Sequence, residues 1–131
     1  MPLRLTAFAR WIPALLWMGV IFYWSNQPSV VSVDWTISKF AHVVEYSLLA
    51  ALLAFALSKS KRWALGAWIV ASIYAITDEL HQGLVPTRHP MATDVLIDSA
   101  AAALTIQAIR QLRSIGRRGA SNRPTTVGRN A

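Results

Sequence analysis

The sequence predicts an all-α, integral membrane four-helix bundle, and three observations lead to this fold class. First, 54% of the 131 residues are hydrophobic and only 15% are charged, whereas charged residues make up about 25% of an average soluble domain. Second, the hydrophobic residues fall into four long segments. Third, the basic residues gather in alternate connections between these segments, as in multi-pass membrane proteins. The length allows one domain. We expect residues 1–115 to form it, and residues 116–131 to be a disordered basic tail.

The composition also excludes several function classes. The chain has no cysteine, so a disulfide scaffold, thiolate metal ligands and a cysteine nucleophile are excluded. The net charge of +7 is compatible with a nucleic-acid partner in principle. Proteins that bind nucleic acids have a largely polar composition outside the core, however, and this chain does not. We therefore predict the lipid bilayer as a partner and no nucleic acid.

Four hydrophobic segments are the predicted spans. Trp11–Val33 carries no charge and is long enough to cross a bilayer unaided. The other three, Ile37–Leu57, Trp63–Leu80 and Val95–Ile109, are shorter or contain polar residues. A secretory signal peptide needs a small-residue cleavage site, and Tyr23–Gln27 offers none, so we interpret the first segment as an uncleaved anchor.

The basic residues predict the orientation. Eleven of the 13 Lys and Arg residues lie before the first segment, between the second and third, or after the fourth. All six acids lie in the other two connections or in the helix ends beside them. By the positive-inside rule, both the N- and C-termini are cytoplasmic, which predicts a multi-pass protein of the inner cell membrane. The basic tail then either acts as a topology signal or lies against anionic headgroups.

The second segment carries an unusual polar group. Lys39, His42 and Tyr46 share one helical face, and Glu45 borders it. A charged side chain within a span is costly and usually faces a bundle interior or water. The structural alternative is that Lys39 extends to the membrane interface and His42 is an ordinary core residue. Glu45 lies too far into the helix for that explanation.

Four polar side chains end the third segment: Asp78, Glu79, His81 and Gln82. Helical geometry places Asp78, His81 and Gln82 on one face, with Glu79 about 100° away. Such a set can ligate a hard or borderline metal, perform acid–base chemistry or bind a polar headgroup. Its spacing matches no standard metal motif, and a solvated helix end is the structural alternative.

The fourth segment opens with Asp94 and Asp98 on one face. Acids favour the first turn of a helix, which explains Asp94. Asp98 needs a partner, a proton or a wet cavity. The small-residue run Ser99–Ala103 that follows suits close helix approach.

The predicted topology brings these groups into one layer near the extracytoplasmic face, as an acidic pocket that opens outward. The layer contains Lys39, His42, Glu45, Asp78, Glu79, His81, Gln82, Arg88, Asp94 and Asp98. The excess of buried acid requires shared protons, a divalent metal or a cationic ligand group. If a metal is the cofactor, its candidate ligands are Asp78, His81, Asp94 and Asp98.

Several short motifs then resemble those of the VanZ-like family over about residues 10–110. They are Phe22–Pro28, Lys39-x-x-His42-x-x-Glu45-Tyr46-x-x-Leu49, Asp78-Glu79-x-His81-Gln82, Val85-Pro86-x-Arg88 and Asp94. The family consists of small bacterial membrane proteins, and its namesake is associated with resistance to the glycopeptide teicoplanin. The resemblance implies that the layer listed above, apart from Asp98 and with Tyr46 added, forms the ligand-binding site, and the charge pattern adds Asp98 to it. Two residues depart from the family pattern: Thr87 stands where a glycine is expected, and Asp98 where an asparagine is expected.

Three functions remain open from the sequence. In the first, the pocket binds an envelope lipid, a lipid-linked glycan or a glycopeptide-like molecule. Lys39 and Arg88 would then meet a phosphate or carboxylate, and the acids would meet amines or hydroxyls.

In the second, the chain is a hydrolase or transferase acting on such a lipid. Its candidate catalytic residues are His42, Glu45, Glu79 and His81, with His42 or His81 as base and Glu79 as acid. No nucleophile elbow, P-loop or zinc-protease helix is present.

In the third, Glu45 and Asp98 relay protons in a small transporter, which requires an oligomer because four short spans enclose little space.

Overall fold

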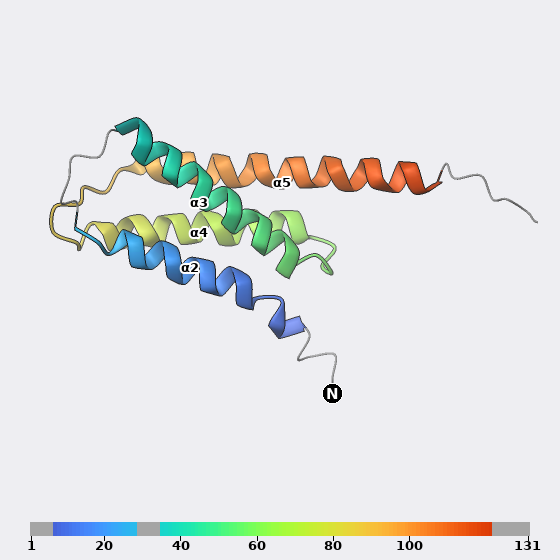
Figure 1. The fold of residues 1–131 in the computed structure, drawn as a ribbon, viewed down its shortest axis with the longest axis horizontal. Helices are drawn as coiled ribbons and strands as arrows, with labels where there is room; N and C mark the ends of the chain where they lie inside the picture. Colours follow the sequence, from blue (N-terminus) through green and yellow to red (C-terminus); the bar gives the residue numbers. More distant parts are fainter. Residues whose placement is uncertain (1–6, 29–34, 122–131) are drawn as a thin grey trace, which may run out of the picture.

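The computed structural model describes residues 7–28 and 35–121, without the side chains of residues 35 and 119–121. Four long helices make up the fold: α2 (Ile12–Ser25), α3 (Trp35–Ala56), α4 (Trp63–Gln82) and α5 (Ala92–Ser121). They run up and down in chain order, so the start of α2 and the end of α5 lie at the same end of the bundle (Figure 1). The residues that the structure describes contain no strand. The all-α, four-helix prediction is confirmed.

Local sequence explains where the helices begin and end. Pro13 lies in the first turn of α2, where its missing N–H costs no hydrogen bond. α4 ends at Gly83, whose N–H donates to the carbonyl of Glu79 at 3.2 Å. Asp94 lies in the first turn of α5, where a carboxylate is favoured by the helix dipole.

The first predicted segment extends beyond the end of its helix, whereas the second and third segments match theirs closely. α2 ends at Ser25, well before the predicted Val33, and residues 29–33 lie outside the described part of the chain. The chain after Ser25 reads Asn-Gln-Pro, and proline disfavours a helical conformation in the residue before it. α3 and α4 agree with their predicted segments to within two residues at each end, which is the usual uncertainty of helix boundaries.

The fourth helix is longer than predicted at both ends. α5 begins at Ala92 rather than Val95 and continues beyond Ile109 to Ser121. It therefore enters the predicted tail, and the expectation of disorder from Gly116 onward is wrong as far as Ser121. This extension contains two glycines, Gly116 and Gly119, each of which costs about 1 kcal/mol in a helix, and the neighbouring arginine, leucine and glutamine residues are good helix formers. The remainder of the tail lies outside the described residues.

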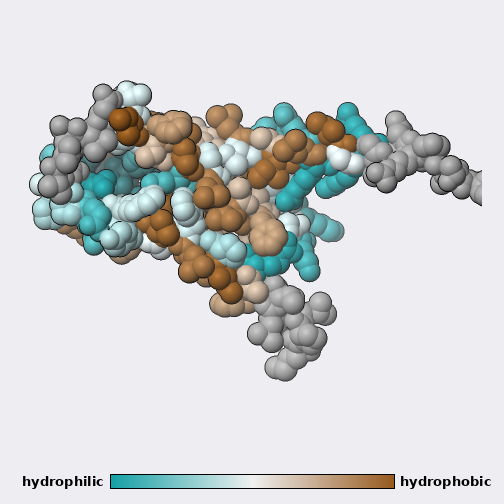
Figure 2. All heavy atoms as spheres, in the orientation of Figure 1, coloured by the Kyte–Doolittle hydropathy of each residue, from teal (hydrophilic) through white to brown (hydrophobic). Residues whose placement is uncertain are grey.

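Three of the helical stretches are long and apolar enough to cross a membrane: Ala7–Ser25, Thr36–Ala56 and Ala92–Arg118. α4 is not among them because polar residues occupy its last turns. Large apolar side chains nevertheless point outward from all helices, including Phe40, Leu80 and Leu104, which are 69%, 68% and 72% exposed. Figure 2 shows these hydrophobic side chains as bands across the body of the molecule. A surface this apolar belongs in lipid, so the chain is a membrane protein. Four membrane passes remain a prediction.

The core consists of large side chains on α3 and small ones on α4 and α5. Its buried members include Tyr46, Leu49, Leu53, Ala67, Ala71, Ala75, Ala102 and Ile106. The α4 alanines recur every fourth residue and form one stripe, which allows close helix packing. In the small-residue run of α5, the Ser99 carbonyl accepts a hydrogen bond from the Trp68 indole at 3.2 Å. α5 packs against both α3 and α4, and its first turns lie beside the first turns of α3 and the last turns of α4 (Figure 1).

Candidate functional site

An ion-pair network joins α3 to α5. Lys39 Nζ forms an ion pair with Asp94, and both side chains are buried. One turn further along both helices, His42 Nδ1 lies 3.2 Å from Asp98 Oδ2, while His42 Nε2 lies 3.8 Å from Asp94 Oδ2. The pairs match in order because α3 and α5 run in the same direction from the same end of the bundle (Figure 1). Lys39 and His42, three residues apart on α3, therefore pair in order with Asp94 and Asp98, four residues apart on α5.

This network shows how the bundle accommodates its charges. Lys39 is only 9% exposed and is paired with Asp94, so the alternative in which it extends to the membrane interface is wrong. The Met91 sulfur also lies 3.9 Å from the Lys39 ammonium. Asp94 and Asp98 would repel one another on the same helix face, and the interleaved Lys39 and His42 offset that repulsion.

α4 adds three buried polar residues to this region. Asp78, Glu79 and Gln82 are each 5% exposed. Gln82 Nε2 donates to Asp78 Oδ2 at 3.0 Å, and Glu79 Oε1 accepts the Met91 backbone N–H at 2.5 Å. Glu79 therefore fixes the segment just before α5. It also interacts electrostatically with Asp94, which places the α4 carboxylates beside the α3–α5 network.

His81 and Arg88 lie against α2 and have a different set of partners. His81 Nε2 is 3.2 Å from Asn26 Oδ1, and its ring lies 4.5 Å from the Phe22 ring. Arg88 donates to the carbonyls of Trp24 at 2.9 Å and Gln27 at 3.0 Å. A cation at the C-terminal end of a helix is favourable, so Arg88 fastens the α4–α5 turn to α2. Asp78, His81 and Gln82 were predicted to share one face. His81 instead contacts Phe22 and Asn26, while Asp78 and Gln82 bond to each other.

Glu45 and Tyr46 complete the polar region. Glu45 is half-buried and interacts electrostatically with His42, Asp78 and Asp98. Its backbone carbonyl accepts a hydrogen bond from the Trp17 indole at 2.9 Å, which ties α2 to α3. Tyr46 is fully buried beneath it. We call the following residues the polar cluster: Lys39, His42, Glu45, Tyr46, Asp78, Glu79, Gln82, Asp94 and Asp98.

Several buried polar atoms of the polar cluster have no hydrogen-bond partner among the residues that the structure describes. These are Asp78 Oδ1, Asp98 Oδ1 and Tyr46 Oη, and nearby in α2 the Ser25 hydroxyl is in the same condition. His42 Nδ1 is also 3.2 Å from Asp98 Oδ1, but the hydrogen-bond geometry is satisfied only toward Oδ2. Buried polar atoms are nearly always paired, so each unpaired one requires an explanation. Two carboxylate oxygens and a phenol are thus the atoms from which a ligand site can be built.

The described residues contain no group of three or more His, Asp or Glu side chains arranged to hold a metal ion. Among the four candidate ligands, Asp94 pairs with Lys39, Asp98 with His42, and His81 with Asn26. The arrangement of these side chains therefore gives no support to a metal centre, which stays a prediction from sequence.

The sequence analysis missed several contributors to this region. Ser25 and Asn26 belong to a quoted motif, and that motif was the available signal for the contact between α2 and His81. Met91 had no signal, because it contributes a backbone N–H and a sulfur atom rather than a polar side chain. Trp17 also contributes, because its indole N–H donates to the Glu45 carbonyl and so joins α2 to α3.

Comparison with known proteins is consistent with this arrangement. A family model described as VanZ/LLP1 matches residues 8–113, a range that contains α2, α3, α4, most of α5 and the whole polar cluster. Neither the curated proteins nor the solved structures gave a significant match. The match covers most of the chain and confirms the VanZ-like resemblance of its motifs. The chain belongs to the VanZ/LLP1 family.

Proposed function

We propose that this chain is an inner-membrane protein of the bacterial cell envelope whose polar cluster binds an amine- or hydroxyl-bearing headgroup. The sources of such a headgroup are an envelope lipid, a lipid-linked glycan or a glycopeptide. The observation that carries the proposal is that Asp78 Oδ1 and the Tyr46 hydroxyl have no hydrogen-bond partner among the described residues, and that Asp98 Oδ1 meets only the His42 ion pair, inside a buried, acid-rich cluster. An ammonium or hydroxyl group of a ligand would donate the hydrogen bonds that these acceptor atoms do not receive from the protein.

The charge of the region favours a donor-rich ligand over an anionic one. Five carboxylates belong to the polar cluster, and Lys39 is its only permanent cation. Lys39 is paired with Asp94, and Arg88 donates to backbone carbonyls of α2. The expectation that Lys39 and Arg88 receive a phosphate or carboxylate therefore has little support. A cationic or polyhydroxyl headgroup complements the remaining carboxylates.

The location of the polar cluster supports access from outside the cell. It lies where α3 begins, α4 ends and α5 begins, whereas the basic run Lys59–Arg62 lies at the opposite end (Figure 1). Since basic residues favour the cytoplasmic side, the polar cluster would be extracytoplasmic. This is the side on which a glycopeptide arrives, and the teicoplanin association of the family's namesake adds a role in glycopeptide resistance to the proposal.

A membrane-embedded hydrolase or transferase is the second candidate. The hydrogen bond that Asp98 Oδ2 accepts from His42 Nδ1 orients the imidazole, as in a general base held by a carboxylate. His81 lies outside the polar cluster, which leaves His42 as the base of this mechanism. The transporter hypothesis has no comparable support, because Glu45 and Asp98 lie at one end of the bundle and α4 and α5 carry no acid toward the other end.

Native mass spectrometry of the full chain in detergent, with added phosphatidylethanolamine or teicoplanin as probes, tests the proposal. We expect the wild type to retain one of these probes and Asp78→Asn to bind it about tenfold more weakly or worse, because a charge-assisted hydrogen bond is lost. Thr93→Ala, at an exposed neighbouring position, is the control and should bind normally. No retention by the wild type, or equal retention by Asp78→Asn, would overturn the proposal. A time-dependent mass change of the bound lipid that His42→Gln abolishes would establish the enzyme instead.

The resistance component has its own test. Expression of the chain in a teicoplanin-susceptible bacterium should raise the inhibitory concentration of teicoplanin, and Asp78→Asn should not raise it. Unchanged susceptibility, with probe binding intact, would remove the resistance role and leave the binding role in place.

A further inference from the structure

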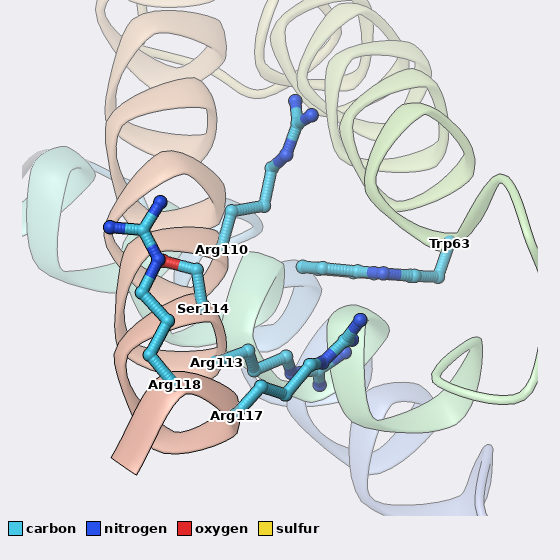
Figure 3. Close-up of a pocket in the computed structure, with 6 residues that line it drawn as sticks. All are labelled: Trp63, Arg110, Arg113, Ser114, Arg117 and Arg118. Atoms are coloured by element: carbon cyan, nitrogen blue, oxygen red, sulfur yellow. The ribbon is translucent and has the colours of Figure 1, made fainter. Parts of the chain in front are cut away.

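A second polar site lies at the opposite end of the bundle from the polar cluster. It is a cavity of about 380 Å³ between the start of α4 and the C-terminal part of α5. We call its lining the arginine pocket: Trp63, Arg110, Arg113, Ser114, Arg117 and Arg118. Figure 3 shows Arg113 and Arg117 extending from α5 toward the Trp63 ring, with Ser114 near Arg118.

The arginine pocket is cationic without any compensating carboxylate. The chain contains no acid from Ser99 to its last residue, and the neighbouring α3–α4 connection carries Lys59, Lys61 and Arg62. The ion pairs found among the described residues all lie in the polar cluster and involve none of these arginines. Four arginines around one cavity repel one another, and an anion in the cavity would relieve that repulsion.

The α5 segment that carries these arginines is amphipathic. The pocket residues of α5 recur at i, i+3, i+4, i+7 and i+8 and therefore share one face. Leu112 and Ile115, between them in the sequence, are 69% and 65% exposed. The Arg113 guanidinium lies over the Trp63 ring, 4.1 Å from its centroid. Exposed apolar residues, a tryptophan and an arginine face together are typical of the level at which lipid headgroups lie.

We propose that the arginine pocket binds the phosphodiester headgroup of an anionic phospholipid from the leaflet at this end of the bundle. Guanidinium groups bind phosphate oxygens in pairs, and four of them line this pocket. Basic pockets between membrane helices on the cytoplasmic side are suited to cardiolipin and similar headgroups. The absence of acids leaves nothing to pair with the amine of a zwitterionic headgroup, so the site selects anionic lipid. This site is independent of the proposed function of the polar cluster.

A competition experiment on the full chain tests this site. Delipidated protein is offered equal amounts of cardiolipin, phosphatidylglycerol and phosphatidylethanolamine in mixed micelles, and the retained lipid is measured by native mass spectrometry. We expect retention of cardiolipin or phosphatidylglycerol over phosphatidylethanolamine by at least tenfold. Millimolar inorganic phosphate should not displace the lipid, because the apolar rim contributes to binding.

The decisive variant is Arg113→Lys/Arg117→Lys, which keeps the positive charge that orients the helices and removes the paired hydrogen bonds. We expect it to reduce anionic-lipid retention about tenfold. The matched control is Arg123→Lys/Arg129→Lys in the C-terminal tail, which should behave as wild type. Equal retention by Arg113→Lys/Arg117→Lys and wild type would show general charge attraction and overturn the site. Equal retention of all three lipids, or displacement of the lipid by inorganic phosphate, would also overturn it.

Discussion

At the scale of single residues, the α4–α5 turn contains a conformation that its sequence does not favour. Thr87 has a φ of 68°, and it is the only non-glycine residue with positive φ in the described part of the chain. The left-handed region is strained for a β-branched side chain. The VanZ-like pattern has a glycine at this position, and glycine adopts positive φ without that penalty. The turn therefore has a backbone shape at Thr87 that a glycine would adopt with less strain.

Thr87→Gly should stabilise the protein by about 1 kcal/mol. Removal of a strained backbone conformation gains about 1–3 kcal/mol, and the greater freedom of glycine in the unfolded chain returns about 0.4–1 kcal/mol. The midpoint of thermal unfolding in detergent measures the change. Thr87→Val retains the β-branch and should give no gain. If both variants lower the midpoint equally, the Thr87 hydroxyl rather than the backbone determines the stability of the turn.

At the scale of secondary-structure elements, the buried charges hold α3 and α5 in register. Lys39 and His42 meet Asp94 and Asp98 in the same order along two parallel helices. A shift of one helix by a turn would leave Lys39 or Asp98 unpaired in the interior. An unpaired buried charge is far more costly than the buried pair is stabilising. We therefore expect the network to specify the arrangement of the helices more than their total stability.

This predicts a non-additive pair of substitutions. Lys39→Met and Asp94→Leu should each destabilise the fold by about 3–5 kcal/mol, because each breaks the buried ion pair and leaves the other charge of the pair in the interior. The double variant replaces both charges with apolar side chains and should recover most of the loss. Unfolding midpoints in a denaturing-detergent titration measure all three. If the losses of the two single variants add in the double variant, the charges do not act as a pair.

At the scale of the whole molecule, charge is divided between the two ends of the bundle. The five acids of the described residues belong to the polar cluster end, and the arginine pocket and the Lys59–Arg62 connection belong to the other. Such a division favours one orientation in the membrane, with the basic end in the cytoplasm. In the proposed orientation, two sites of opposite charge would face opposite leaflets, with a donor-rich headgroup proposed for one and a phosphate for the other.

The orientation can be tested with single cysteines, because the chain has none of its own. His89→Cys, in the α4–α5 turn, should react with a membrane-impermeant maleimide in intact spheroplasts. Lys61→Cys, in the α3–α4 connection, should react only after the membrane is permeabilised. Both positions are exposed, so protein packing does not limit the reaction. The reverse labelling pattern would mean that both termini are extracytoplasmic.

The site was predicted in part because helical spacing restricts which side chains can share a face. The sequence placed Lys39 with His42 and Asp94 with Asp98, and it indicated that buried acids would need partners. It could not assign the pairs, since the partners come from helices that are far apart in the chain. The separation of His81 from Asp78 and Gln82 likewise depends on α2, because Phe22 and the C-cap residue Asn26 contact the imidazole.

The sequence by itself determined the helical class, the approximate helices and the division of charge between the two ends. Each of these follows from local patterns of apolar, basic and acidic residues. The tertiary structure decided which charges pair and which polar atoms have no hydrogen-bond partner. It also decided that Trp63 and four arginines line one cavity. Such features depend on distances between separate helices, and these distances are set by the packing of the alanine stripe on α4 and the large side chains of α3 rather than by any local pattern.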